Sequence, residues 1–229
     1  IGAAYGSAGE RCMAISAVIA VDAIAEPLKE ILIQKIETLK IGPGKDPNND
    51  MGPLITKEHK QKVMDYIESG ESSGAELVID GREHPITNEG AGFFLGPTLF
   101  DRVSPDMKIY LEEIFGPVLV MLRAKNFQQA LDLVNNHRFG NGVAVFTSSG
   151  SIAREFTNKV QIGMVGVNVA IPVPLSFYSF GGWKDSIYGS SNIYGMDGVR
   201  FFTKLKTVTT RWPDLDQSSA VDLSMPTVE

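Results

Sequence analysis

The segment Pro117-Val118-Leu119-Val120-Met121-Leu122 is an apolar run, typical of a strand that is covered on both faces of its sheet. Apolar residues at helical spacing follow over Phe127 to Val134. The alternation continues with a strand over Val143 to Phe146, a helix around Ile152 to Phe156 and a strand over Val165 to Val169. Such an order favours parallel pairing. We therefore expect an α/β fold with a mainly parallel sheet and helices on both faces.

More strands and helices are expected on the amino-terminal side of this unit. Ile15 to Val21 is rich in Val, Ile and Ala without polar alternation, as in a covered strand. Thr56 is suited to cap the helix that follows it. The expected elements are strands over residues 15–21, 76–81 and 93–100 and helices over residues 23–39 and 57–69.

The carboxy-terminal part of the chain has a different pattern. Leu175 to Gly198 is rich in glycine and aromatic residues and is expected to form a loop. From Phe201 to Trp212, charged and polar residues alternate with apolar ones, which predicts a strand with one face exposed or paired with another subunit. Asp214 to Glu229 is polar and is expected to be a loose tail.

Composition and charge exclude several classes of protein. The chain has 229 residues, 43% of them apolar and 21% charged, which suits a soluble protein with one large or two small domains. A net charge of −6 provides no basic surface for nucleic acid. The longest apolar run, Ala14 to Val21, is far too short to span a membrane. We therefore expect neither a nucleic-acid partner nor a membrane.

The only cysteine lies in Gly9-Glu10-Arg11-Cys12-Met13, directly after a run of small residues. Gly9 lets another group approach the backbone closely, and Arg11 places a positive charge beside the thiol, as is found next to reactive cysteines. These features suit a covalent nucleophile, although a lone cysteine is more often a small buried apolar residue. The five residues alone leave both interpretations open.

Two further segments combine unusual residue types. Leu111-Glu112-Glu113-Ile114-Phe115-Gly116-Pro117-Val118 places two carboxylates and an aromatic just before a strand, where ligands often bind. Ser179-Phe180-Gly181-Gly182-Trp183-Lys184-Asp185-Ser186 places a double glycine between aromatics, which permits a tight turn. Taken singly, the first is equally typical of a solvated charge pair and the second of a surface turn.

Taken together and in this order, the three segments resemble the aldehyde dehydrogenase superfamily. The pattern G-x-x-C, then E-E-I-F-G-P, then F-G-G-x-K-x-S extends over nearly the whole chain. The resemblance is closest to the CoA-acylating methylmalonate-semialdehyde dehydrogenases, on the strength of three segments: Gly9 to Ala14, Gly163 to Pro174, and Phe202 to Trp212.

The resemblance implies a role for five residues. Cys12 matches the nucleophile, whose backbone N–H forms half of the oxyanion hole. Glu113 matches the carboxylate that binds the nicotinamide ribose of NAD, and Phe115 matches the ring against the nicotinamide end. Phe180 matches an aromatic at the mouth of the aldehyde pocket. Arg11 is expected to hold the substrate carboxylate in a bidentate fork, the alternative being a structural salt bridge with Glu10 or a distant acid.

The implied reaction oxidises methylmalonate or malonate semialdehyde with NAD through a thioester on Cys12. The acid beside the thioester would be lost as carbon dioxide, and CoA would take the acyl group to give propionyl-CoA or acetyl-CoA, a step of valine catabolism. No metal is expected, because His59, His84 and His137 have no ligand spacing and are interpreted as surface or loop residues. A homo-oligomer, a dimer or a tetramer, is expected.

The expected domain organisation is incomplete relative to the superfamily. Residues 1–200 resemble its catalytic domain and residues 201–229 its oligomerisation strand with a tail, while the amino-terminal NAD-binding half is absent. The abrupt start, Ile1-Gly2-Ala3-Ala4-Tyr5, is typical of the inside of a helix, so we expect a piece of a longer polypeptide. Gly140-Asn141-Gly142 leads into a strand rather than out of one and is no dinucleotide fingerprint.

Departures from the family leave other functions open. Gly9-Glu10 replaces the commoner Gly-Gln, and Phe180-Gly181-Gly182 stands where many close relatives carry F-T-G. The alternatives are an aldehyde dehydrogenase for a neutral substrate and a non-catalytic fragment that self-associates. The single cysteine fits a reducing compartment, and no signal peptide for secretion is visible. The resemblance implies the mitochondrial matrix for a eukaryotic source and otherwise the cytoplasm.

Overall fold

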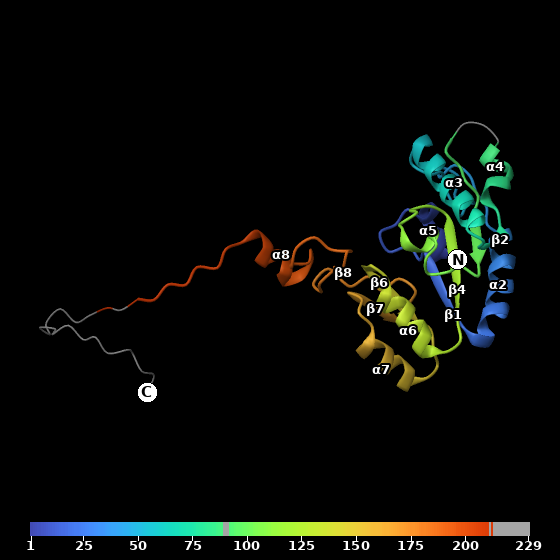
Figure 1. The fold of residues 1–229 in the computed structure, drawn as a ribbon. Helices are drawn as coiled ribbons and strands as arrows, with labels where there is room; N and C mark the ends of the chain where they lie inside the picture. The colour runs from blue at the N-terminus through green and yellow to red at the C-terminus, as the bar shows by residue number, and fades with distance from the viewer. Residues whose placement is uncertain (89–91, 211, 213–229) are drawn as a thin grey trace, which may run out of the picture.

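A computed structural model of the chain describes residues 1–88, 92–210 and 212. Its centre is a four-stranded sheet in the order β1 (Ala17–Val21), β4 (Val118–Ala124), β3 (Thr98–Asp101) and β2 (Glu76–Ile79) (Figure 1). Strands β1, β4 and β3 are parallel, and β2 is antiparallel to β3. The expected α/β fold with a mainly parallel sheet is therefore confirmed.

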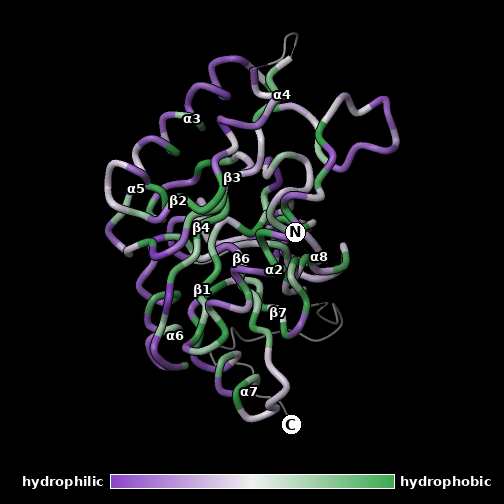
Figure 2. Tube along the Cα trace, turned by 90° about the vertical axis from the view of Figure 1, so that its right-hand side faces the viewer, coloured by the Kyte–Doolittle hydropathy of each residue, from purple (hydrophilic) through white to green (hydrophobic). Residues whose placement is uncertain are grey.

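Helices pack around this sheet. Val63 and Ile67 of α3 and Ile36 of α2 are buried in the same hydrophobic cluster as Phe100 and Leu119 of the strands. Figure 2 shows hydrophobic residues concentrated along the strands, whereas much of α3 is hydrophilic. The longer helices are α2 (Ala25–Glu37), α3 (Lys57–Ser72), α6 (Phe127–Asn136), α7 (Gly150–Lys159) and α8 (Gly195–Phe202). The short ones are α1 (Gly2–Tyr5), η1 (Gly6–Gly9), η2 (Asp22–Ile24), η3 (Gly81–Glu83), α4 (Pro85–Asn88) and α5 (Lys108–Leu111).

Local chemistry explains where the elements begin. The Thr56 hydroxyl accepts a 3.1 Å hydrogen bond from the His59 N–H, so the predicted cap of α3 is confirmed. The strand expected over residues 93–100 starts only at Thr98, because Gly96 donates its N–H to Gly81 instead of joining the sheet. Pro97, just before the strand, has no N–H to donate.

The strand–helix–strand unit that follows β4 differs from the prediction in one respect. Strands β6 (Gly142–Val145) and β7 (Met164–Val167) pair in parallel as expected, but they form a separate two-stranded sheet. Both edges of β4 are already hydrogen-bonded, to β1 and β3, so β4 has no free edge for β6. A third small sheet joins β5 (Phe139–Gly140) to β8 (Trp183–Lys184) in antiparallel fashion.

The carboxy-terminal segment also corrects two expectations. Strand β8 and the start of α8 lie within the predicted loop Leu175 to Gly198. The strand predicted from Phe201 is wrong at its start, because α8 continues to Phe202 and the Thr203 hydroxyl donates to the Val199 carbonyl at 2.7 Å. Residues 203–210 belong to no sheet of the described chain, and the predicted tail from Asp214 lies outside the described residues.

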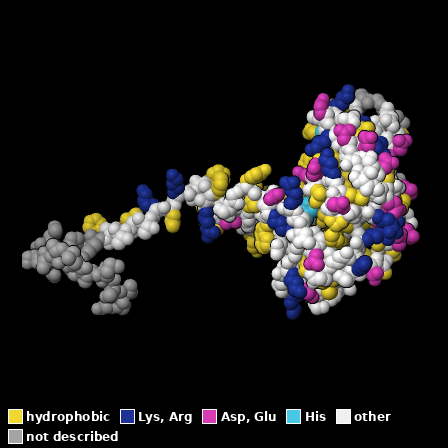
Figure 3. All heavy atoms as spheres, viewed as in Figure 1, with side chains coloured by type: hydrophobic (Ala, Val, Ile, Leu, Met, Phe, Trp, Pro, Cys, Tyr) yellow, Lys and Arg dark blue, Asp and Glu magenta, His cyan; other side chains and the backbone are white. Residues whose placement is uncertain are grey.

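Beyond α8 the chain leaves the body of the molecule as an arm (Figure 1). We call residues 203–210 the C-terminal arm. Its apolar side chains are largely exposed, Leu205 at 98% and Val208 at 72%. Figure 3 shows hydrophobic side chains along the arm and at its base, where Phe201 and Phe202 are also exposed. Such a surface is typical of one that is covered by a partner.

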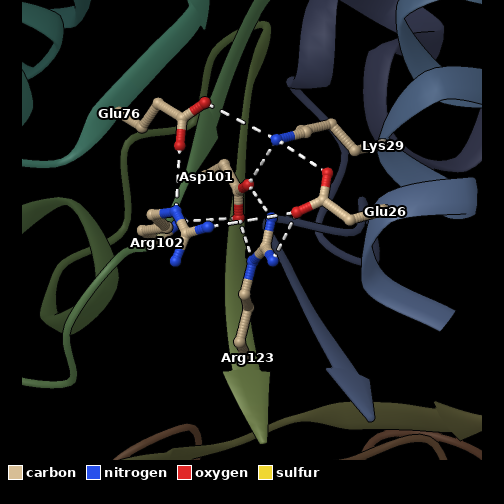
Figure 4. Close-up of polar contacts among 6 residues, drawn as sticks. All are labelled: Glu26, Lys29, Glu76, Asp101, Arg102 and Arg123. Atoms are coloured by element: carbon tan, nitrogen blue, oxygen red, sulfur yellow. Dashed lines mark hydrogen bonds and ion pairs between the residues drawn. The ribbon is translucent and has the colours of Figure 1, made fainter. Parts of the chain in front are cut away.

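A network of charged side chains ties α2 to three strands at one end of the sheet (Figure 4). Asp101 is fully buried and pairs with Arg123 of β4 and, at 3.2 Å, with Lys29 of α2. We call this set the ion network, and its members are Glu26, Lys29, Glu76, Asp101, Arg102 and Arg123.

Candidate active site

Cys12 lies on a tight loop between η1 and β1. Three consecutive residues before it, Ser7, Ala8 and Gly9, have φ angles of 54°, 54° and 72°, in the left-handed region. The loop is closed by hydrogen bonds from the Glu10 N–H to Ser7 and from the Ala14 N–H to Arg11, both 3.0 Å long. Cys12 itself is a free, exposed cysteine. The interpretation as a small buried residue is therefore wrong, since the turn holds the cysteine at the surface.

The amino-terminal segment is anchored to the sheet just ahead of this loop. Tyr5 is 1% exposed, and its hydroxyl donates a 3.0 Å hydrogen bond to the Thr98 carbonyl of β3. Burial raises the pKa of the Tyr5 hydroxyl far above its ordinary value, so the hydroxyl keeps its proton. The Cys12 loop thus starts from a fixed point on the central sheet.

The loop before β4 lies directly against the Cys12 loop. A side chain at Gly9 would collide with the carbonyl of Gly116, so only glycine fits this crossing. Phe115, next to Gly116, has a φ of 57°, which is uncommon for a residue with a side chain, and its ring is 38% exposed. The two segments that the sequence singled out separately are therefore in backbone contact.

The two adjacent carboxylates of this loop have different surroundings. Glu112 accepts a 2.7 Å hydrogen bond from the Tyr66 hydroxyl. Burial and this carboxylate raise the pKa of Tyr66 to about 12. Glu113 is exposed, and among the described residues it makes no ion pair or side-chain hydrogen bond. Glu113 is therefore free to bind a ligand.

His59 joins the two loops, contrary to its interpretation as a surface or loop residue. Its Nε2 atom lies 2.6 Å from the Phe115 carbonyl oxygen and 3.4 Å from Oε1 of Glu10. Burial raises the pKa of Glu10, while His59 and the backbone N–H of Ile55 act in the opposite direction. His59 is placed by helix α3, and no spacing in the sequence indicates this contact.

The glycine-rich third segment approaches the Cys12 loop through Asn141. Strand β8 pairs with β5, which brings Gly182 so close to Asn141 that a Cβ atom on Gly182 would lie 3.1 Å from the Asn141 Cα. The Asn141 side chain in turn donates a 2.9 Å hydrogen bond to the Cys12 carbonyl. The half-buried Phe180 ring precedes this turn and lies 5.3 Å from the Tyr194 ring.

The Arg11 side chain lies against the segment that precedes the Cys12 loop. Its Nε donates a 3.2 Å hydrogen bond to the Ser7 hydroxyl, and its guanidinium lies against Gly6. In the described part of the chain Arg11 forms no ion pair, and Glu10 is paired with His59 instead. Arg11 borders a pocket of about 330 Å³ that is lined by Ile1, Gly2, Tyr5, Gly6, Arg11, Leu39, Asp50 and Met51.

The histidines and carboxylates of the described residues form no metal site. In residues 1–88, 92–210 and 212, no group of three His, Cys, Asp or Glu is placed to hold a metal ion. His137 instead has a structural role, since its Nε2 lies 2.9 Å from the Tyr110 carbonyl oxygen and its Nδ1 accepts the Phe139 N–H. None of the helices described is both long and apolar enough to cross a bilayer.

The exposed Cys12 loop is in backbone contact with the loop that carries Glu113 and Phe115. The aldehyde dehydrogenase family model matches residues 1–208, and the chain belongs to this family. It is 50% identical, over all of its length and 46% of the relative's, to a malonate-semialdehyde dehydrogenase of Pseudomonas aeruginosa. A malonate-semialdehyde dehydrogenase of Halalkalibacterium halodurans is 47% identical over 93% of this chain and 43% of that protein.

Solved structures agree with these relatives. The methylmalonate-semialdehyde dehydrogenase of Oceanimonas doudoroffii superposes with a TM-score of 0.90 and 51% identity, over 93% of this chain and 44% of that one. A betaine aldehyde dehydrogenase of Staphylococcus aureus, solved in complex with NAD+, has a TM-score of 0.74 and 29% identity over 80% of this chain and 36% of that one. The chain spans about half the length of the relatives it matches.

Proposed function

We propose that this chain is the catalytic-domain portion of a dehydrogenase that oxidises malonate or methylmalonate semialdehyde with NAD and CoA. The observation that carries the proposal is the convergence of three separate segments on the exposed Cys12. The Cys12 loop contacts Gly116 through Gly9. It is also hydrogen-bonded by Asn141, whose backbone contacts Gly182. Two relatives that are 50% and 47% identical to this chain are named malonate-semialdehyde dehydrogenase, which supports the choice of aldehyde.

The residues present suit the nicotinamide end of NAD. Glu113 offers an exposed carboxylate without a partner in the described chain, as the two hydroxyls of a ribose require. The exposed Phe115 ring offers a flat apolar surface next to the Cys12 loop. When bound, NAD+ would supply the hydride acceptor. We assign Glu113 to the ribose and Phe115 to the nicotinamide end.

In the proposed reaction, the Cys12 sulfur forms a bond to the aldehyde carbon and gives a thiohemiacetal. The Cys12 N–H donates to the oxygen on which negative charge develops. Loss of hydride leaves a thioester on Cys12, with the oxygen returning to a carbonyl and its proton leaving to solvent. The carboxylate one carbon away is then released as carbon dioxide, a proton from solvent takes its place, and CoA displaces the Cys12 thiolate.

Two further side chains are assigned to the substrate. The Arg11 guanidinium has no acid partner within the described residues, so it can bind the substrate carboxylate as a fork. The Phe180 ring, packed on Tyr194 beside the turn at Gly182, is assigned to the mouth of the aldehyde pocket. A neutral aldehyde has no carboxylate for Arg11 to bind. The effect of an Arg11 substitution therefore distinguishes an acidic substrate from a neutral one.

We also propose that the enzyme is a homo-oligomer assembled through the C-terminal arm. The observation that favours assembly is the exposure of Phe201, Phe202, Leu205 and Val208 on one continuous segment. Apolar side chains in such a row are expected to be covered by a second copy of the chain.

The test uses a polypeptide of the relatives' length that contains this chain. NADH formation is measured with methylmalonate semialdehyde, malonate semialdehyde and propionaldehyde, each with and without CoA. We expect turnover with the two acids to require CoA and to exceed that with propionaldehyde. In an Arg11→Met variant, KM should rise for the acids and stay nearly unchanged for propionaldehyde. Preference for propionaldehyde without CoA would establish the neutral-substrate alternative.

A further inference from the structure

We infer that Asn141 is a positioning residue for the Cys12 nucleophile, holding the Cys12 peptide in place from outside the three motif segments. The inference rests on the proposed function of Cys12. Asn141 lies 129 positions after Cys12 in the sequence, yet its Nδ2 atom is 2.9 Å from the Cys12 carbonyl oxygen. The Gly140-Asn141-Gly142 segment has no other assigned function.

The direction of this hydrogen bond is fixed by chemistry. A backbone carbonyl oxygen can only accept, and of the two polar atoms of an asparagine side chain only Nδ2 donates. The same Nδ2 also lies 3.2 Å from the sulfur of Met13, a weak acceptor. Asn141 therefore binds two consecutive residues of the Cys12 loop through one amide group.

Asn141 is itself held rigidly between two strands, β5 and β6. Its carbonyl accepts the Met164 N–H at 3.1 Å, and the neighbouring Gly140 accepts from Gly163 and donates to the Ser186 hydroxyl, both at 3.0 Å. A hydrogen bond from such a fixed group restricts the orientation of the peptide that it binds. The Cys12 peptide is thus oriented by the small sheets rather than by its own loop alone.

Packing around Asn141 supports the same role. The Met13 side chain fills the space beside Gly142 so closely that a Cβ at position 142 would collide with it. On the other side, the backbone of Asn141 touches the turn at Gly182. Asn141 therefore links the segment assigned to the aldehyde pocket with the segment that carries the nucleophile.

The Cys12 carbonyl takes no part in the proposed reaction, whereas the Cys12 N–H and sulfur do. Tethering the carbonyl fixes the backbone from which both reacting groups project. Asn141 contacts neither the aldehyde nor the reacting atoms, and it acts through Cys12. Loss of the tether should therefore lower kcat, which depends on orientation, far more than it changes KM.

The first experiment compares variants in a polypeptide of the relatives' length. Asn141→Leu removes the hydrogen-bond donor, and Asn141→Asp keeps the shape of the side chain. Asn135→Leu is the matched control, because the Asn135 side chain hydrogen-bonds the backbone of Lys159 and Gln161 and not the Cys12 loop. We expect kcat to fall about tenfold to a hundredfold in both Asn141 variants, as misplacement by a fraction of an ångström to 1 Å would produce. KM for NAD should stay within about threefold, because no NAD contact is lost.

The pH dependence of kcat distinguishes a loss of positioning from a general disturbance of the fold. An ionised carboxylate at position 141 repels the Cys12 carbonyl, whereas a protonated one can donate to it. The ratio of kcat for Asn141→Asp to kcat for Asn141→Leu should therefore rise as pH falls toward 5. A flat ratio, or a loss of kcat in Asn135→Leu equal to that in Asn141→Leu, would overturn the inference.

A second experiment does not depend on the substrate. Cys12 is the only cysteine of the 229-residue chain, so the rate of its alkylation by iodoacetamide reports on this loop alone. We expect Asn141→Leu to change the rate by about threefold or more and Asn135→Leu to leave it unchanged, with equal rates for all variants in denaturant. Equal rates in the folded chains would overturn the tether. A changed rate without any aldehyde turnover would contradict only the proposed function.

Discussion

At the scale of single residues, Cys12 is the side chain that we assign to the covalent chemistry. It is the only thiol among the 229 residues and it is exposed, so this chain offers an aldehyde one thiol to react with. In a polypeptide of the relatives' length, Cys12→Ala should abolish the acyl adduct that forms with methylmalonate semialdehyde and NAD when CoA is withheld. Intact-mass spectrometry checks this, with the unaltered protein as control. An adduct in the Cys12→Ala protein would show that another residue is the nucleophile.

His59 is a second residue with a testable role, because it holds the strained Phe115 backbone. Its 2.6 Å contact with the Phe115 carbonyl is one hydrogen bond, worth about 1 kcal/mol, and its loss should raise KM for NAD about fivefold. His59→Leu removes the donor, whereas His59→Gln retains one and should recover most of the affinity. His84→Leu is the matched control, since His84 lies between η3 and α4. KM for NAD is measured by steady-state kinetics at varied NAD. Equal KM values for His59→Leu and His59→Gln would count against this role.

At the scale of elements, the ion network fixes α2 to the sheet. Burial alone would raise the pKa of Asp101, but hydrogen bonds from Arg123, the Arg102 N–H and Lys29 outweigh it and hold that pKa below its ordinary value. Asp101→Asn should therefore lower the free energy of unfolding by about 3 kcal/mol, as for other buried pairs that lose one partner. Arg102→Gln, at a side chain 60% exposed, should cost less than about 1 kcal/mol.

The same network makes stability depend on pH, with a sign that follows from the lowered pKa of Asp101. The folded chain binds the Asp101 proton less readily than the unfolded chain, so this contribution is fully present above the ordinary carboxyl pKa. It is lost as pH falls through the lower folded value. Urea unfolding between about pH 6 and pH 3 should therefore show a shallower loss of stability for Asp101→Asn than for the unaltered chain. Parallel curves of unfolding free energy against pH for the two proteins would show that Asp101 does not cause this pH dependence.

The C-terminal arm is the element assigned to assembly. Deleting residues 204–229 removes Leu205 and Val208, the exposed apolar side chains that a second copy of the chain would cover. We expect the deletion to lower the molecular mass measured by light scattering to that of a smaller assembly. An unchanged mass would place the contact between subunits elsewhere.

At the scale of the whole molecule, the 229-residue chain alone should show no measurable dehydrogenase turnover. Glu113 and Phe115 are assigned to only one end of NAD, and the sequence has no glycine-rich helix start of the kind that binds a pyrophosphate. Removing one oxyanion donor costs about 10²–10³ in turnover, and the Cys12 N–H is the one donor that our proposal assigns within the described residues. NADH formation should appear when the chain is mixed with the separately made amino-terminal half of the protein. Equal rates with and without that half would show that NAD binds elsewhere.

The sequence alone determined the elements that have strong local patterns. The apolar run of β4 and the Thr56 cap of α3 were predictable because each depends on residues close together in the chain. The family was recognisable from three short segments, since close backbone contacts such as Gly9 on Gly116 restrict which residues can stand there.

Only the tertiary structure decided which side chains surround Cys12. The sequence indicates only a surface or loop residue at His59 and a segment leading into a strand at Asn141, because nothing local distinguishes these two residues from other polar ones. Their contacts join positions 56 and 129 residues apart, and such pairs are fixed by how helices and strands pack. The same holds for β6: its apolar pattern predicted a strand, but its separation from β4 followed from the pairing of β4 on both edges.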